Sequence, residues 1–165
     1  MQHRLAAYNF GIFTQPAEHS ANEGWRQRHD PLMDLVEKAP GFIARSGYDG
    51  EPGPDSWGKQ IVPRFYKERG DGWSPATLSL WENPQSLFNF TYKGLHREAF
   101  ALGKSWFERG EWPPYVLWWV QNDQTPDWTE GVARFEHLHD HGPTPHAFSF
   151  KQTFDAQGQS IAIQP

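Results

Sequence analysis

One histidine of this sequence stands where a general base would be useful. His96, in YKGLHREA, shares an apolar stripe of helical spacing with Tyr92 and Phe100. An imidazole titrates near neutral pH, so His96 could remove an acidic C–H or O–H proton from a bound molecule. The other interpretation is a partly buried histidine that bonds to a backbone carbonyl or to Tyr92.

Two further residues on predicted strands are candidate companions of His96. The amide of Asn9 could stabilise an enolate or superoxide-like charge in a dry pocket, and the indole of Trp81 could wall the substrate. Alternatively, Asn9 bonds to the backbone at a bulge and Trp81 belongs to the core. The predicted substrate-binding side chains are aromatic: Tyr92, Phe100, Trp119, Phe65 and Trp57.

The segment EHLHDHGPTPH suggests metal chemistry. His137 and His141 are four residues apart and would share one face of a helix, as metal-binding pairs can. Histidines near the end of a helix also interact favourably with its dipole without any metal. We therefore expect no metal and keep this pair as the weaker alternative.

The elements that must position these residues follow from periodicity and breakers. Helices are predicted at roughly 23–39, where the helix could instead begin at Asp30 and Pro31, at 84–109 with a break near Gly94, and at 127–140. Strands are predicted at 4–13, 42–46, 76–82, 115–121 and 147–154. Residues 48–74, rich in Gly and Pro yet bearing several large apolar side chains, form a long ordered excursion that folds back on the body.

This order of elements indicates an α+β protein: a ferredoxin-like antiparallel sheet with helices on one face, in a single domain spanning 1–165. The face of such a sheet that the helices do not cover would be exposed to solvent. Trp118 and Trp119 are neighbours on a strand and point to opposite faces, so both faces carry large apolar groups. A partner subunit, the excursion or an enclosed pocket could cover the second face, and face-to-face dimerisation is the simplest solution.

Three blocks of the sequence resemble a known bacterial family. They are TLSLWENPQSLFNFTYKGLHREAFALGKSWFE, PPYVLWWV and FEHLHDHGPTPHAFSFKQTF, and the shorter LAAYNFG and APGFIARS extend the match toward the N-terminus. The family is domain of unknown function 3291, which in turn is similar to the dimeric α+β barrel proteins. That superfamily includes antibiotic-biosynthesis-type monooxygenases and haem-degrading enzymes. The excursion is longer than such small barrels normally carry.

The resemblance implies a homodimer in which two sheets close into a barrel. It also implies a histidine such as His96 facing the pocket, and so a cofactor-independent monooxygenase or a proton-abstracting isomerase acting on a small apolar or aromatic molecule. A dimer that binds an apolar ligand without turning it over is an alternative. A haem protein with His96 as axial ligand is another, less favoured because Phe90 stands where haem-degrading relatives carry a tryptophan.

Composition narrows the classes of function. The chain has 165 residues, no cysteine, a formal net charge of -5 and dispersed Lys and Arg, which argues against thiolate chemistry and against nucleic acid or an anionic membrane as partners. No apolar stretch has the length of a membrane span or secretory signal, so a soluble cytoplasmic protein is expected.

Overall fold

The fold is described from a computed structural model, which places residues 2–67, 74–93, 97 and 106–165. Along the chain its elements are β1 (His3–Phe10), the 3-10 helix η1 (Ser20–Asn22), α1 (Glu23–Val36), β2 (Phe42–Arg45), β3 (Ala76–Trp81), α2 (Pro84–Tyr92), β4 (Tyr115–Gln121), α4 (Trp128–His141), β5 (Thr153–Phe154) and β6 (Ser160–Ile161).

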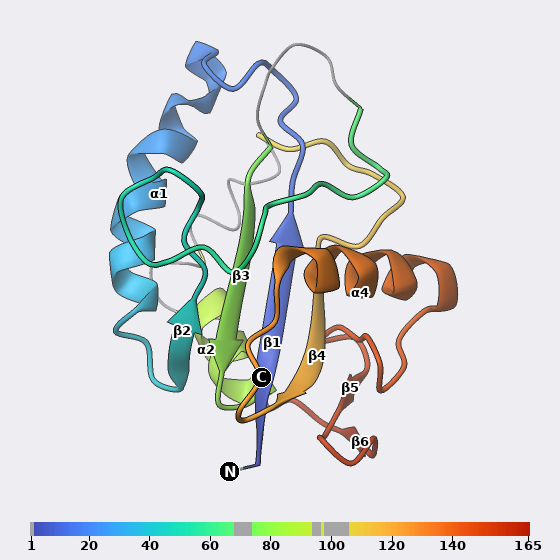
Figure 1. Cartoon of the computed structure of the whole chain (residues 1–165). Coiled ribbons are helices and arrows are strands. Elements are labelled where there is room, and N and C mark those ends of the chain that lie inside the picture. The colour runs from blue at the N-terminus through green and yellow to red at the C-terminus, as the bar shows by residue number, and fades with distance from the viewer. Residues whose placement is uncertain (1, 68–73, 94–96, 98–105) are drawn as a thin grey trace.

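Four of the strands form one antiparallel sheet in the order β2-β3-β1-β4 (Figure 1). The central strand β1 pairs with both neighbours, so that Leu5 lies opposite Trp81 on one side and opposite Trp119 on the other. Strands and helices alternate as β1-α1-β2-β3-α2-β4, which is the split β-α-β arrangement expected of a ferredoxin-like unit. The α+β class and the antiparallel sheet are confirmed.

Helices cover both faces of this sheet, so the prediction of helices on one face is wrong. Leu5, Trp81 and Leu117 belong to the core cluster that includes side chains of α1 and α2. Tyr8 and Trp118 point the other way, into a cluster with the apolar side chains of α4. Figure 1 shows α4 crossing in front of the strands and α2 behind them.

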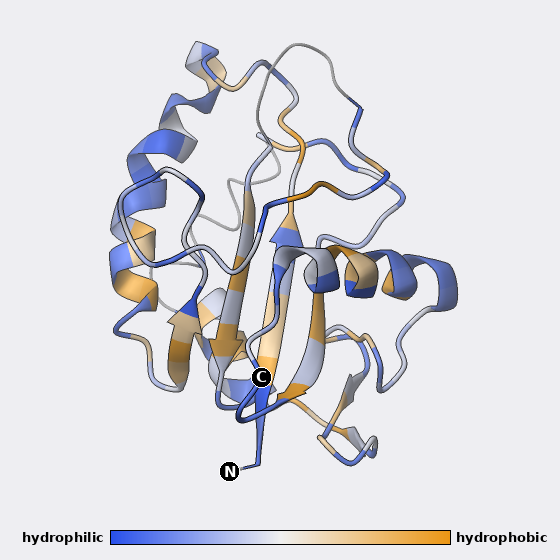
Figure 2. Cartoon of the chain, in the orientation of Figure 1, coloured by the Kyte–Doolittle hydropathy of each residue, from blue (hydrophilic) through white to orange (hydrophobic). Residues whose placement is uncertain are grey.

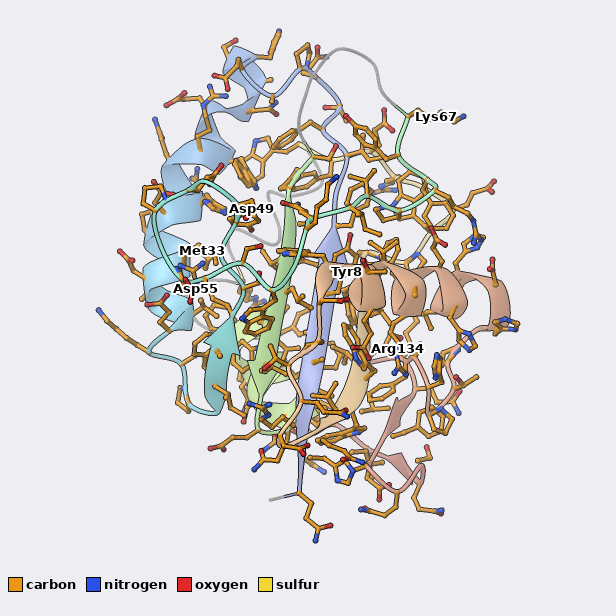
Figure 3. The ribbon with its side chains drawn as sticks, viewed as in Figure 1. Tyr8, Met33, Asp49, Asp55, Lys67 and Arg134 are labelled. Carbon is orange, nitrogen blue, oxygen red and sulfur yellow. The ribbon has the colours of Figure 1, made fainter. Side chains whose placement is uncertain are left out.

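A glycine lets α4 approach the sheet closely. A Cβ on Gly131 would lie 3.1 Å from the ring of Tyr8, tighter than ordinary van der Waals contact. The Tyr8 ring packs edge-on against Phe135, with 5.5 Å between ring centroids, and against Trp128 at 6.2 Å. Figure 3 shows Tyr8 where α4 crosses β1. Bulk at position 131 would push the helix off the strand.

The described part of the excursion, residues 48–67, folds back on the body as predicted, and it packs on this second face. Tyr48 stacks on Trp128 at 5.8 Å, and Phe65 packs edge-on against Phe135 at 5.9 Å. Arg64 ties the excursion to α4, because its guanidinium bonds to the carboxylate of Asp140. That hydrogen bond, followed by the bond from His139, lowers the pKa of the Asp140 carboxyl well below its usual range.

The chain therefore covers its own second face. We expected a partner subunit there because a large apolar surface would otherwise face water, and α4 with the excursion removes that need. The face is not open to a second sheet. The homodimer stays a prediction that now lacks this support.

Local packing also decided two boundaries that the sequence left open. α1 runs unbroken from Glu23 through Pro31, so a start at Asp30 is wrong. Its first turns are held by packing: Trp25 lies edge-on to Phe13 at 5.3 Å, which offsets the backbone bond that a proline removes. The predicted strand at 147–154 is reduced to β5 and isolated bridges, which join Phe148 to Leu117, Ala147 to Thr144 and Ser149 to Gln152.

Replacing Phe135 by alanine tests the role of α4. The ring is fully buried between helix and sheet, so Phe135→Ala should lower the free energy of unfolding by about 3–5 kcal/mol in urea denaturation followed by circular dichroism. Val62→Ala is the control, since Val62 is 48% exposed and its loss should change stability by less than about 0.5 kcal/mol. Equal effects in the two variants would contradict the packing of α4.

Candidate functional site

Asn9 and Trp81 lie on the same face of the sheet but do not converge. Asn9 pairs with Thr77 in the register of β1 and β3, whereas Trp81 pairs with Leu5. Thr77 and Trp81 are four residues apart on one strand, which is about 13 Å. His96 and Phe100 lie outside the described residues, so the predicted group of His96, Asn9 and Trp81 is not brought together within the described chain.

Each of these two residues has a structural partner of its own. The exposed Asn9 accepts hydrogen bonds through Oδ1 from the backbone N of Thr77 at 2.9 Å and from its Oγ1 at 2.7 Å. Trp81 is 1% exposed and donates from Nε1 to Oγ of Ser79 at 3.0 Å. These contacts correspond to the structural alternatives, in which Asn9 braces the backbone and Trp81 is core.

The predicted aromatic lining is divided by the sheet. Trp57 and Phe65 pack on the α4 side. Trp119 belongs to the opposite cluster, and Tyr92 lies next to Phe150 there, with 5.9 Å between ring centroids. One aromatic pocket built from all four side chains is therefore wrong, because the strands stand between them.

An apolar groove, which we call the α1–α2 groove, opens between α1 and α2. It has a volume of about 340 Å³ and is lined by Leu32, Leu35, Ala39, Pro40, Ser86, Asn89, Phe90 and Lys93. Figure 2 shows the apolar colour gathered on the C-terminal part of α1, where Leu32 and Leu35 lie. Leu35 is 41% exposed there and is one of three exposed large apolar side chains in the described chain.

Local sequence signals fix the start of α2 and the approach of β2 to it, next to the groove. Asn83 caps α2 by accepting a hydrogen bond from the backbone N of Ser86 at 2.9 Å, with Pro84 in the first turn. Gly41, with a φ of +80°, then brings the start of β2 against α2; a Cβ there would lie 2.2 Å from Oγ of Ser86. Behind the groove, the Phe90 ring lies 5.5 Å from Trp81.

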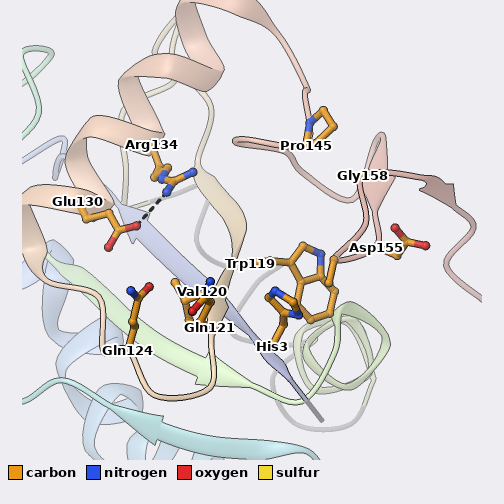
Figure 4. Close-up of a pocket in the computed structure, with 11 residues that line it drawn as sticks. His3, Trp119, Val120, Gln121, Gln124, Glu130, Arg134, Pro145, Asp155 and Gly158 are labelled. Atoms are coloured by element: carbon orange, nitrogen blue, oxygen red, sulfur yellow. Dashed lines mark hydrogen bonds and ion pairs between the residues drawn. The ribbon is translucent and has the colours of Figure 1, made fainter.

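A second groove, the β4–α4 groove, is polar. It measures about 280 Å³ and is lined by His3, Trp119, Val120, Gln121, Gln124, Glu130, Arg134, Pro145, Asp155, Ala156 and Gly158 (Figure 4). One wall is an ion pair within α4: Arg134 Nη2 lies 3.0 Å from Glu130 Oε1, which also accepts a 3.0 Å bond from Trp118 Nε1. The spacing of four residues between Glu130 and Arg134 is the sequence signal for this ion pair, and our sequence prediction missed it.

Three histidines meet beside this wall. The ring of His137 lies 4.3 Å from that of His141 and 4.5 Å from that of His146, measured between centroids. Arg134 Nη1 lies 2.9 Å from His146 Nδ1, and this positive charge beside the ring disfavours a metal cation there. No metal-binding group of three His, Cys, Asp or Glu side chains occurs among the described residues. The pair His137 and His141 remains the weaker alternative.

The same cluster makes stability depend on pH. Burial lowers the pKa of His137, and the nearby His141 and Arg134 lower it further, because a charged imidazole would be desolvated and repelled. The unfolded chain therefore binds this proton more readily than the folded chain. The contribution to stability is present above pH 6.5, the ordinary pKa, and is lost as the pH falls below it.

We accordingly expect the free energy of unfolding in urea to be smaller at pH 5.5 than at pH 7.5, and His137→Gln to narrow that difference. His29→Gln, on α1 and outside the cluster, controls for removal of a histidine as such. If the free energy of unfolding changes between pH 5.5 and pH 7.5 as much in His137→Gln as in the parent protein, the packing of these rings does not govern the pH dependence of stability.

Residues 4–163, nearly the whole chain, match the family described as Domain of unknown function (DUF3291). The chain belongs to this family. The predicted family membership is thus confirmed, and all lining residues of the two grooves except His3 lie within the matched region. No curated protein and no solved structure matches the chain. Among the described residues, no helix has the length and apolar character needed to cross a membrane.

Proposed function

We propose that this DUF3291 protein binds a small apolar or aromatic molecule in the α1–α2 groove. The observation that carries the proposal is the groove itself, whose walls are Leu32, Leu35, Ala39, Pro40 and Phe90. Concave apolar surface with a few polar groups is typical of small-molecule sites.

Polar atoms at the rim would orient such a ligand. Asn89 is held in place because its Oδ1 accepts a 3.0 Å hydrogen bond from Gln85 Nε2. Its amide nitrogen, the hydroxyl of Ser86 and the ammonium of Lys93 supply donors at one edge of the groove. A ligand with an apolar ring and one carbonyl or hydroxyl oxygen fits this distribution.

We further propose that the bound molecule is a substrate and that His96 is its general base. His96 follows Lys93 by three residues, a length of chain that spans at most about 11 Å. Proton abstraction would begin an isomerisation or a cofactor-independent oxygenation, as the resemblance to the monooxygenase-like barrels suggests. Binding without turnover is the competing function.

Replacing Leu35 by glutamine tests the location of the site. Titration of a neutral fluorescent probe, N-phenyl-1-naphthylamine, should show binding that Leu35→Gln weakens about tenfold, because one apolar wall is lost. Val62→Gln is the matched control, being 48% exposed on the excursion. Equal weakening in both variants, or a dimer that dissociates in Leu35→Gln without any change in probe binding, would contradict a ligand site here.

The role of His96 is tested by deuterium exchange. An apolar ligand found by screening carbonyl and phenolic compounds should exchange its acidic C–H protons in D₂O in the presence of the protein, followed by NMR. His96→Gln should slow this exchange at least about 100-fold while affinity is kept, because a general base contributes that much.

His29→Gln is the control, and the ligand's C–H protons should exchange in its presence as fast as with the parent protein. Binding without any exchange in the parent protein would favour the non-catalytic function. A Soret band that forms on adding haem and disappears in His96→Gln would favour the haem alternative.

A further inference from the structure

The lining of the β4–α4 groove includes a rigid aromatic side chain (Figure 4). Trp119, at the end of β4, is half-buried, and its Nε1 donates a 2.8 Å hydrogen bond to the carbonyl of Phe154. This bond holds the indole against β5, on the face of the sheet opposite α4. A fixed ring offers apolar surface at little cost in conformational entropy when a ligand stacks on it.

The polar side chains that line the groove are held in position, and they still have donor or acceptor atoms without a hydrogen bond. Asp155 Oδ1 accepts bonds from the backbone N of Gln157 at 3.0 Å and of Gln159 at 2.8 Å, which leaves its second oxygen available. Glu130 is held through Oε1 alone. In the described chain the side-chain amides of Gln121 and Gln124 make no hydrogen bond.

The charges select against ions as ligands. The guanidinium of Arg134 is engaged with Glu130 and with His146, to whose carbonyl it donates a 2.7 Å bond, so few of its donors remain for an anion. Glu130 is in turn neutralised by Arg134. One carboxylate, Asp155, is left beside neutral amides, too little to hold a strong cation in water.

We propose that this groove binds a small neutral polyhydroxylated ring, a monosaccharide or a cyclic polyol. One face of the ring stacks on Trp119, and its hydroxyls bond to Gln124, Glu130 and Asp155, whose planar groups suit paired hydroxyls. The volume of about 280 Å³ lies near the lower end of small-molecule sites, which suits a single ring. This site is separate from the α1–α2 groove and does not rest on the function proposed for it.

Titration of the ¹⁵N-labelled protein with glucose, galactose and myo-inositol tests the proposal. At least one of them should shift the indole N–H signal of Trp119 and the side-chain amide signal of Gln124 in a saturable way. Gln124→Ala should weaken the binding about fivefold, the effect of one lost hydrogen bond. Gln152→Ala, another exposed glutamine outside the groove, is the matched control and should leave the affinity unchanged.

Three outcomes would overturn the proposal. The first is that none of the three probes causes a saturable shift at these signals. The second is that choline or inorganic phosphate saturates them while the sugars do not, which would make the ligand an ion. The third is equal weakening by Gln124→Ala and Gln152→Ala. Leu35→Gln should leave the sugar titration unchanged, so failure of either groove can be recognised separately.

Discussion

The structure depends on burying large side chains on both faces of one small sheet. Trp118 is fully buried on one face, and Trp81 and Leu117 are buried on the other, so each face needs a cover. The chain supplies both covers itself: α1 and α2 on one side, α4 and the excursion on the other. Each large side chain taken from water contributes roughly 1.5–3 kcal/mol, so neither layer could be removed without losing much of the stability of a domain this size.

This two-sided burial also decides where ligands can bind. The interior between sheet and helices is filled by side chains such as Tyr8, Phe135 and Trp128, which leaves room at the seams between layers. The α1–α2 groove lies at the seam of two helices, and the β4–α4 groove where the edge strand, the last helix and the β5–β6 connection meet. The two grooves differ in chemistry because the first is lined by the apolar end of α1, and the second by the charged side of α4.

Burying an aromatic side chain that carries a polar atom destabilises the fold when that atom finds no hydrogen-bond partner. The hydroxyl of Tyr8 and the Nε1 of Trp128 are buried and form no hydrogen bond within the described chain. Burial raises the pKa of Tyr8, since a phenolate there would be poorly solvated. Trp118 avoids the same penalty through its bond to Glu130, which Arg134 neutralises. An ion pair on the rim of a groove thus satisfies a donor of the core.

Short-range information in the sequence was enough for most elements. The alternation of ATLSLW and YVLWWVQ predicts β3 and β4, and Asn83 and Asp127 mark the starts of α2 and α4 because their side chains accept backbone N–H groups close by in the chain. The family and the α+β class followed as well. None of this reports which face of the sheet a helix will cover, since an amphipathic helix has the same pattern on either side. The place of α4 depended on a contact between Gly131 and Tyr8, more than a hundred residues apart. The positions of the predicted site residues relative to one another depend on long-range contacts in the same way. The sequence places Asn9, Trp81 and Trp119 on their strands and Phe65 in the excursion, but long-range packing sets the distances between them. It puts Asn9, Trp81 and Trp119 on one side of the sheet and Phe65 on the other.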